Sequence, residues 1–357
     1  MNKEIIQMQR VAKAALTARE QLGKSVEYAR RGVVDEAAAI LSADPGQTIS
    51  LFGIKDTSQI VRAIPERLGE LPGFIFHTLD RMAPGGRAID PNLVNLLTGR
   101  VMTGSSSGSC VNILLAINDL AVGTDGGGSV LAPALATGLY SIMAKGLGLK
   151  GISAKRSTDS IKFVPGLGII SHSYDLCLQA VSKLTEIEVL PTERPEMAVI
   201  KPMDNRLAQV FEQTAAALAP KAILKFYDHP RCSERPALID YLRLLFAKAQ
   251  LVLSFEGPVD LYGYGDSVLG ELGMIGRGEQ ENGGKSFLKV TNMVEATAIG
   301  IPAQELGSGV LVMAPPGSGP GSAALAVGKW LTQALPRPKL FAEYFIQSWA
   351  RSGAGYL

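Results

Sequence analysis

Residues 123–133 read GTDGGGSVLAP, and this stretch decides the class of the chain. Three consecutive glycines, Gly126–Gly128, stand directly before Ser129. Glycine loses the most backbone entropy on ordering, so such a run is poor material for the interior of a helix or strand. A second small-residue cluster, TGSSSGS at residues 103–109, lies upstream, and its Ser105 precedes Ser129 by 24 residues. The two clusters indicate loops that bring backbone N–H groups close to an anionic group.

Ser129 has the surroundings of a nucleophile. A serine attacks a carbonyl group only when a neighbouring group accepts its proton, and the oxyanion that then develops needs hydrogen-bond donors. The amides of Gly126, Gly127 and Gly128 can supply such donors. The alternative is structural: the glycines form a turn that opens a helix near Ala132, and Ser129 is its N-cap.

Lys55 directly follows the apolar stretch TISLFGI at residues 48–54. One interpretation is a solvated lysine at the end of a strand, paired with Asp56 or free. The other is a lysine buried among serines, whose pKa is lowered by burial until the neutral amine can act as a base. Sequence alone leaves both open.

Ser106 is a competing nucleophile, because residues 104–108 match the pattern G-x-S-x-G. That motif needs a strand before it and a catalytic histidine after it. Residues 95–102 make a poor strand, and the later histidines, His172 and His229, lie in ordinary contexts. Without that strand and that histidine, we do not expect Ser106 to be the nucleophile.

Composition excludes several classes of protein. The 357 residues carry a formal net charge of +2 and 19% charged residues, which gives no basic surface for nucleic acid. Three cysteines without metal-ligand spacing fit reduced cytosolic thiols, and only three histidines are present. No secretory signal and no apolar run of membrane-spanning length is found. We therefore expect a cytoplasmic protein without metal, membrane or nucleic-acid partner. Nothing decides between a monomer and a homo-oligomer.

Alternating helices and strands predict an α/β fold, with one sheet covered by helices on both faces. We expect one domain over residues 1–357, with N-terminal helices in 1–45. Helices are expected at 7–31, 33–43, 110–119, 132–144, 173–184, 207–218, 236–249 and 322–335. Strands are expected at 48–54, 120–122, 160–163, 251–255 and 309–313. Residues 257–284 are expected to form a long glycine-rich loop over a site. The candidate pocket residues there are Tyr262, Tyr264, Arg277, Glu279 and Glu281. The alternative for each of them, which the sequence favours, is a solvated position in the loop.

The two serine clusters and the lysine together resemble the amidase signature family of serine amidohydrolases. That family has a Gly-Gly-Ser-Ser-Gly-Gly-Ser stretch and a Gly-Thr-Asp-x-Gly-Gly-Ser-Ile-Arg-x-Pro stretch, after an upstream Val-Lys-Asp. Residues 104–109, residues 123–133 and Lys55-Asp56 fit these motifs. The 24-residue offset between the serines is the family's own spacing. Weaker similarity extends over about residues 48–335.

The resemblance implies an α/β/α sandwich around a large mixed sheet. It also implies a catalytic triad in which Ser129 attacks an amide carbonyl, Ser105 passes on the proton, and Lys55 is the base. The peptide bond of Ser105 is cis in the family. The amides of Gly126, Gly127, Gly128 and Ser129 would form the oxyanion hole. The implied function is cleavage of a C–N amide bond in a small molecule through an acyl-enzyme, without a cofactor.

Departures from the family pattern leave two alternative functions open. Leu131 stands where the family usually has arginine, and Ser105 follows Lys55 by only 50 residues, about twenty fewer than the family norm. A non-catalytic or repurposed binding protein on the same fold is one alternative. Amide transfer, as in the amidotransferase A subunit of the family, is the other.

Overall fold

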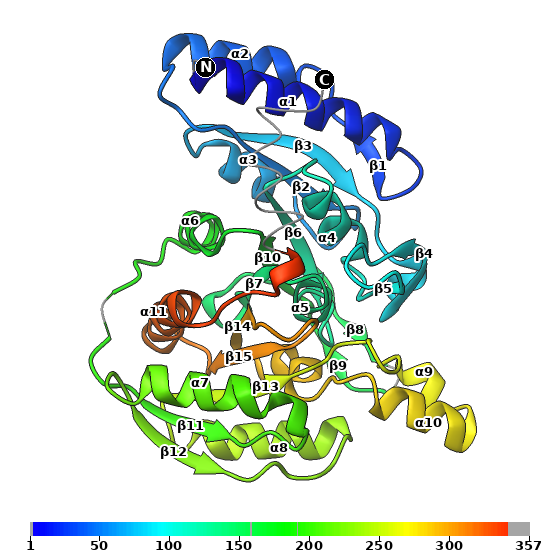
Figure 1. Ribbon diagram of the computed structural model, residues 1–357, viewed down its shortest axis with the longest axis vertical. Helices are drawn as coiled ribbons and strands as arrows, with labels where there is room; N and C mark the ends of the chain where they lie inside the picture. The colour runs from blue at the N-terminus through cyan, green and yellow to red at the C-terminus, as the bar shows by residue number, and fades with distance from the viewer. Residues whose placement is uncertain (1–2, 158, 191, 342–357) are drawn as a thin grey trace.

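One large mixed sheet forms the centre of the computed structural model, which describes residues 3–157, 159–190 and 192–341 (Figure 1). Eleven strands lie in the order β1-β3-β2-β6-β10-β7-β14-β15-β13-β11-β12. Their bounds are β1 Val26–Ala29, β2 Ser50–Lys55, β3 Phe74–Asp80, β6 Leu120–Asp125, β7 Tyr140–Met143, β10 Gly166–Ser171, β11 Glu196–Ile200, β12 Ile223–Tyr227, β13 Leu251–Glu256, β14 Thr297–Pro302 and β15 Gly309–Ala314. Two small hairpins pair β4 (Ile89–Val94) with β5 (Val101–Thr103), and β8 (Lys155–Arg156) with β9 (Lys162–Phe163).

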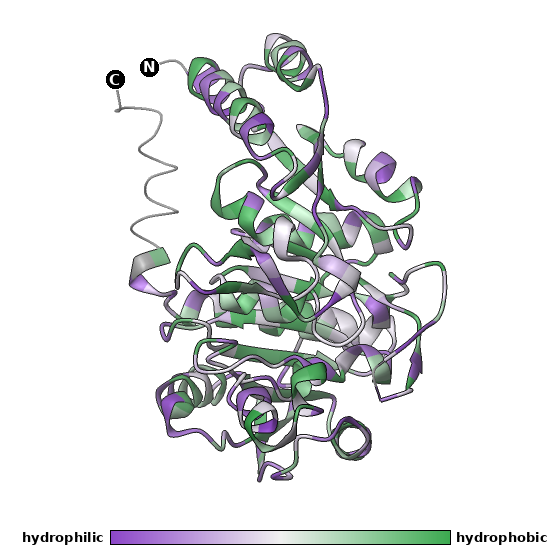
Figure 2. Ribbon diagram, turned by 90° about the vertical axis from the view of Figure 1, so that its right-hand side faces the viewer, coloured by the Kyte–Doolittle hydropathy of each residue, from purple (hydrophilic) through white to green (hydrophobic). Residues whose placement is uncertain are grey.

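Helices cover both faces of the sheet, as expected for an α/β/α sandwich. Alternate residues of the strands enter different apolar clusters: Val199 and Leu253 pack with α3, α6, α7 and α11, whereas Ala198 and Val252 pack with α5 and α8. Figure 2 shows apolar strands in the interior and hydrophilic residues mostly on the outer helices and loops. The helices are α1 Lys3–Glu20, α2 Val33–Ala43, α3 Ala63–Gly69, α4 Ser107–Leu114, α5 Leu131–Ala136, α6 Tyr174–Thr185, α7 Ala208–Leu218, α8 Arg235–Phe246, α9 Ser267–Gly270, α10 Gly273–Glu281, α11 Ser318–Ala334 and α12 Lys339–Phe341.

Two predicted helices are shorter than expected, because a left-handed glycine is followed by a strand. The helix expected over 7–31 ends at Glu20, Gly23 adopts φ 73°, and β1 then pairs with β3. The helix expected over 132–144 ends at Ala136, Gly138 adopts φ 65°, and β7 follows. Since only glycine reaches positive φ without a steric cost, each glycine permits the change of direction.

The expected loop over 257–284 contains the helices α9 and α10, so that expectation is wrong in part. Polar contacts attach this segment to the chain before Ser105. Arg87 forms an ion pair with Asp266 at 2.9 Å, and Thr103 Oγ1 donates to Asp260. Lys285, which directly follows the segment, donates to Thr103 Oγ1 at 2.8 Å and pairs with Asp260 at 2.6 Å. The segment is thereby held beside the first serine cluster.

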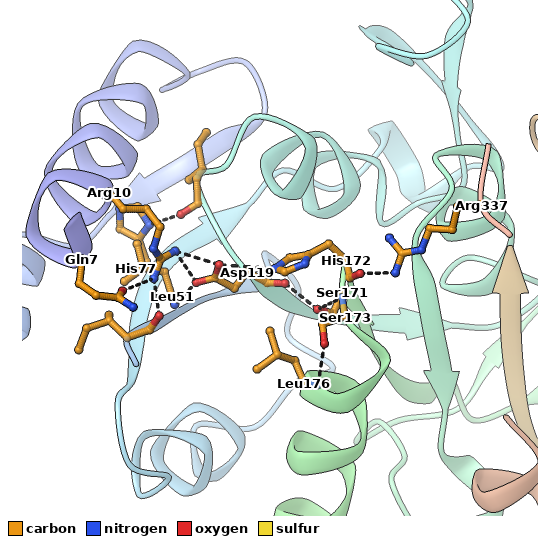
Figure 3. Close-up of polar contacts among 12 residues, drawn as sticks. Gln7, Arg10, Leu51, His77, Asp119, Ser171, His172, Ser173, Leu176 and Arg337 are labelled. Atoms are coloured by element: carbon orange, nitrogen blue, oxygen red, sulfur yellow. Dashed lines mark hydrogen bonds and ion pairs between the residues drawn. The ribbon is translucent and has the colours of Figure 1, made fainter. Parts of the chain in front are cut away.

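A polar network around Asp119 joins α1 to the sheet (Figure 3). Both carboxylate oxygens of Asp119 accept from Arg10 Nη1 at 2.9 Å, and Oδ2 also accepts from the Leu51 amide at 2.7 Å. His172 Nε2 lies 3.6 Å from Oδ1. Burial alone would raise the pKa of Asp119, but Arg10 and His172 hold it well below its usual range.

We expect Arg10→Met to lower the free energy of unfolding by about 2–3 kcal/mol at pH 7, because it leaves a largely buried carboxylate without its cation. A depressed carboxyl pKa stabilises the fold above the unfolded value and loses this effect as pH falls through the folded one. The difference between variant and wild type should therefore shrink below about pH 4. Urea unfolding at several pH values measures it. Lys13→Met, at an exposed position of the same helix, is the control; an equal loss there would contradict the assignment.

Candidate active site

Lys55 lies at the carboxyl end of β2, and its whole side chain is buried, with 1% of the residue exposed. Strand β2 runs parallel to β6, so the carboxyl ends of the two strands lie side by side. Lys55 Nζ donates to Ser105 Oγ at 2.6 Å, to Thr124 Oγ1 at 3.0 Å and to the Thr124 carbonyl at 3.3 Å. The interpretation of Lys55 as a solvated lysine is therefore wrong. Its neighbour Asp56 is exposed, whereas Lys55 is not.

Burial favours the neutral amine of Lys55. Burial lowers its pKa to about 7, although the nearby Asp125 acts in the opposite direction. Within the described ranges Lys55 forms no ion pair. At pH values above about 7 the amine is therefore mostly unprotonated and can accept a proton.

Backbone hydrogen bonds on both sides hold Ser105 in place. Its carbonyl accepts from the Ala83 amide at 3.2 Å. The next amide, of Ser106, donates to the Ser129 carbonyl in the second serine cluster at 3.3 Å. The chain turns at Gly104, where φ is 70° and an added Cβ would lie 2.4 Å from Pro133 Cδ. These contacts bring the Ser105 and Ser129 segments together.

The peptide bond before Ser105 is not cis, contrary to the expectation from the resemblance. Among the described residues the cis bond is Gly257–Pro258. A cis bond before a residue other than proline costs about 3 kcal/mol. Gly104 makes the turn with positive φ instead, at no such cost.

Ser129 is half-buried, and its hydroxyl forms no hydrogen bond within the part of the chain that the structure describes. The alternative role as a helix cap is not supported. Helix α5 begins at Leu131 with Val130 at the N-cap position and without a side-chain cap. Ser106, by contrast, is fully buried, and Gly123 and Val130 pack closely around it, which leaves no access for a substrate.

Asp125 shapes the glycine loop, and sequence reasoning did not single it out. Its buried carboxylate accepts from the amides of Gly128 and Val130, both at 2.7 Å, and of Leu131 at 3.3 Å. The Gly128 amide, predicted as an oxyanion donor, is thus directed to Asp125. The amides of Gly126, Gly127 and Ser129 donate no hydrogen bond within the described residues.

Three side chains surround the glycine loop at close range. An added Cβ would lie 2.4 Å from Phe163 at Gly126, 3.6 Å from Arg235 Nη2 at Gly127, and 2.5 Å from Leu288 at Gly128. Packing therefore excludes a side chain at Gly126 and Gly128, whereas a Cβ at Gly127 would make only ordinary contacts. Of the candidate pocket residues, Tyr262 is stacked by Arg206 at 4.3 Å and Tyr264 by Arg100 at 4.7 Å.

Two classes of site find no support in the described residues. No group of His, Cys, Asp and Glu side chains there could hold a metal ion. Within the same ranges, no helix has both the length and the apolar character needed to cross a membrane.

Comparison with solved structures defines the class of fold. An amidase matches with a TM-score of 0.64 at 17% identity, covering 94% of this chain and 97% of that one. The peptide amidase of Stenotrophomonas maltophilia gives 0.61 at 13% identity, over 95% of both chains. The A subunit of the glutamyl-tRNA(Gln) amidotransferase of Thermotoga maritima gives 0.62 at 14% identity, over 92% of this chain and 94% of that one.

The chain therefore has the fold of these amidases over nearly its whole length. No family model and no curated protein sequence matches it. At such low identity the fold is shared, and the chemistry has to be argued from the site itself.

Proposed function

We propose that the protein is an amidohydrolase that cleaves a C–N amide bond of a small molecule through a Ser129-Ser105-Lys55 relay. One observation carries the proposal: Nζ of the fully buried Lys55 lies 2.6 Å from Ser105 Oγ. Burial lowers the pKa of Lys55 to about 7, so the neutral amine can accept the Ser105 proton across this contact. A charged or solvated lysine could not serve as a base at neutral pH, whereas this one can.

The reaction proceeds in two halves. The Ser129 hydroxyl, which forms no hydrogen bond in the described structure, first has to turn to Ser105 Oγ. Ser129 Oγ then attacks the amide carbonyl carbon, its proton passes to Ser105 Oγ, and the Ser105 proton passes to Lys55 Nζ. The amides of Gly126, Gly127 and Ser129 face the developing oxyanion. The relay then returns the proton to the leaving nitrogen as the C–N bond breaks, which leaves an acyl group on Ser129. Water attacks this ester by the same relay, and the acid is released.

A fluorophosphonate probe tests the proposal directly. The probe phosphonylates an activated serine with loss of fluoride, and peptide mass spectrometry locates the modified residue. We expect the label on Ser129 in the wild type and a much slower reaction in Lys55→Ala. Wild-type protein that stays unlabelled would support the alternative of a non-catalytic binding protein on the amidase fold.

The proposal also predicts how the rate depends on pH. Because the neutral amine is the reactive form, amide hydrolysis or labelling should rise about tenfold per pH unit below pH 7 and level off above it. Lys55→Arg keeps the positive charge but cannot release a proton, so the rising limb should disappear. Rates measured between pH 5 and pH 9 test this prediction. If the rate of the variant still rose with pH as in the wild type, a group other than Lys55 would have to be the base.

Amide transfer is the second candidate, favoured by the fold shared with the A subunit of the amidotransferase. Both reactions pass through the same acyl-enzyme and differ in the acceptor. Hydroxylamine added with an amide substrate separates them: a transferase gives mainly the hydroxamate, and a hydrolase mainly the acid.

A further inference from the structure

Strands β11, β12 and β13 form a doubly wound unit at one end of the sheet (Figure 1). The central strand β11 pairs in parallel with β12 on one side and with β13 on the other. Helix α7 connects β11 to β12, and α8 connects β12 to β13. The two helices pack on opposite faces, because Met197 and Val199 share a cluster with α7, and Ala198 and Ile200 share one with α8.

This topology creates a switch point between β11 and β13. The connection that leaves β11 leads to β12 on one side, and the connection that leaves β13 leads to β14 on the other. A crevice therefore opens outside the carboxyl ends of β11 and β13, and ligands of open α/β sheets bind in such crevices. A cavity of ≈ 410 Å³ lies at this place, lined by Ile200 and Lys201 after β11, His229 after β12, and Ser254 and Phe255 of β13. Its volume is in the range of sites for small organic molecules. Lys55, Ser105 and Ser129 are not among its described lining residues.

Basic side chains dominate the polar lining of this crevice. Its charged residues are Lys201, Arg206, Arg231, Lys285 and Lys289 against Asp204 and Glu281. Three of the cations are neutralised by carboxylates: Lys201 by Asp228 at 3.0 Å, Lys285 by Asp260 at 2.6 Å, and Arg206 by Asp204.

Arg231 and Lys289 remain as unpaired cations. Within the described part of the chain neither forms an ion pair, and Lys289 Nζ donates only to the Ser233 carbonyl at 3.1 Å. Burial and the nearby Arg235 lower the pKa of Lys289 to about 8, although the buried Glu256 acts in the opposite direction, so the group stays mostly protonated below that pH. An anion bound in the crevice would stabilise the charged form of Lys289.

His229 and Ser286 add a neutral donor. The Arg231 amide donates to His229 Nδ1 at 3.1 Å, which places the ring proton on Nε2. Nε2 lies 2.8 Å from Ser286 Oγ and donates to it. Ser286 Oγ therefore accepts from the ring and keeps its own O–H to donate to a ligand.

We propose that this crevice binds a small organic anion through a phosphate or carboxylate group, held by Arg231, Lys289 and the Ser286 hydroxyl. Lys55, Ser105 and Ser129 do not line the crevice, although the Lys289 carbonyl lies 3.6 Å from an added Cβ at Gly127, so the crevice adjoins the glycine loop. The ligand undergoes no reaction in the crevice.

Calorimetric titration at pH 6.5 and low ionic strength tests the proposal with ribose 5-phosphate, citrate and inorganic phosphate, and with ribose as the neutral control. We expect saturable binding of at least one of the anions and none of ribose. The two organic anions distinguish a phosphate from a carboxylate site. Arg231→Ala/Lys289→Ala should weaken binding about tenfold or more, since charge-assisted hydrogen bonds are lost. Lys13→Ala/Arg19→Ala, which removes two exposed cations from α1, should change it less than about twofold.

Cys232 offers a second measurement, because it lines the crevice and is half-buried, whereas Cys110 and Cys177 are buried. Iodoacetamide should modify Cys232 first, and a bound anion should slow that reaction. Arg231→Ala, at an exposed position, should remove the protection without unfolding the protein. Ser129→Ala should retain both the binding of the anion and the protection of Cys232. The test of the crevice therefore does not depend on the amidase proposal. Absent anion binding in the wild type, or equal weakening in both double variants, would overturn the proposed site.

Discussion

Ser129→Ala should abolish fluorophosphonate labelling and reduce amide hydrolysis by a factor on the order of 10³ or more. The size of the effect follows from the role of Ser129, because without the Oγ no acyl-enzyme forms and only general stabilisation by the site remains. Stability should change little, since the hydroxyl forms no hydrogen bond within the described residues. Labelling followed by intact-mass spectrometry, together with product release from an amide substrate, measures the loss.

Ser106→Ala is the matched control for this variant. Its hydroxyl is fully buried without a hydrogen-bond partner in the described structure, so its removal should leave labelling within about a factor of three. The labelling rate of Ser105→Ala should lie between those of Ser129→Ala and Ser106→Ala, because the relay loses its middle member while the nucleophile remains. If Ser129→Ala were still labelled at the wild-type rate, the nucleophile would have to be another serine.

Asp125→Ala should cost about 3 kcal/mol in the free energy of unfolding and should also abolish labelling. The substitution leaves the buried amides of Gly128, Val130 and Leu131 without an acceptor, and each unsatisfied buried group costs about 1–3 kcal/mol unless water reaches it. The glycine loop then loses the contact that positions Ser129. Urea unfolding and the labelling rate of the folded protein give the two quantities.

Asp125→Asn separates positioning from folding. The asparagine keeps one acceptor oxygen, but its NH₂ group faces backbone donors, so labelling should fall more steeply than stability. Asp56→Ala, at an exposed carboxylate close to Lys55, is the control and should change unfolding by less than about 0.5 kcal/mol. An Asp125→Asn variant with full labelling would show that the loop keeps its shape without the carboxylate.

Local pattern predicted three of the buried strands closely. Strands β2, β13 and β15 were expected close to their observed bounds, because both faces of each are covered and the residues form continuous apolar runs. In the large sheet, β1, β3, β7, β10, β11, β12 and β14 were not predicted, although β10 and β14 are buried throughout. Strand β12 at the sheet edge exposes most of its side chains, so its sequence lacks that signal.

Pattern also failed where an alanine-rich segment changes structure at a glycine. Residues 132–144 carry good helix formers, yet helix α5 ends at Ala136 and β7 begins at Tyr140. The pairing of β7 with β10 and β14 decides this outcome. Tertiary pairing overrides propensity here, as it often does in short segments.

The residues available for chemistry are evident in the sequence: two serines 24 residues apart, a glycine run before the second, and a lysine after an apolar stretch. The burial of Lys55 against Ser105, 50 residues away, depends on long-range contacts, because the parallel pairing of β2 with β6 places it beside the serine clusters. The same pairing removes water from the amine and lowers its pKa. The role of Asp125 and the crevice between β11 and β13 likewise depend on contacts between segments distant in the chain, and a local pattern does not record these.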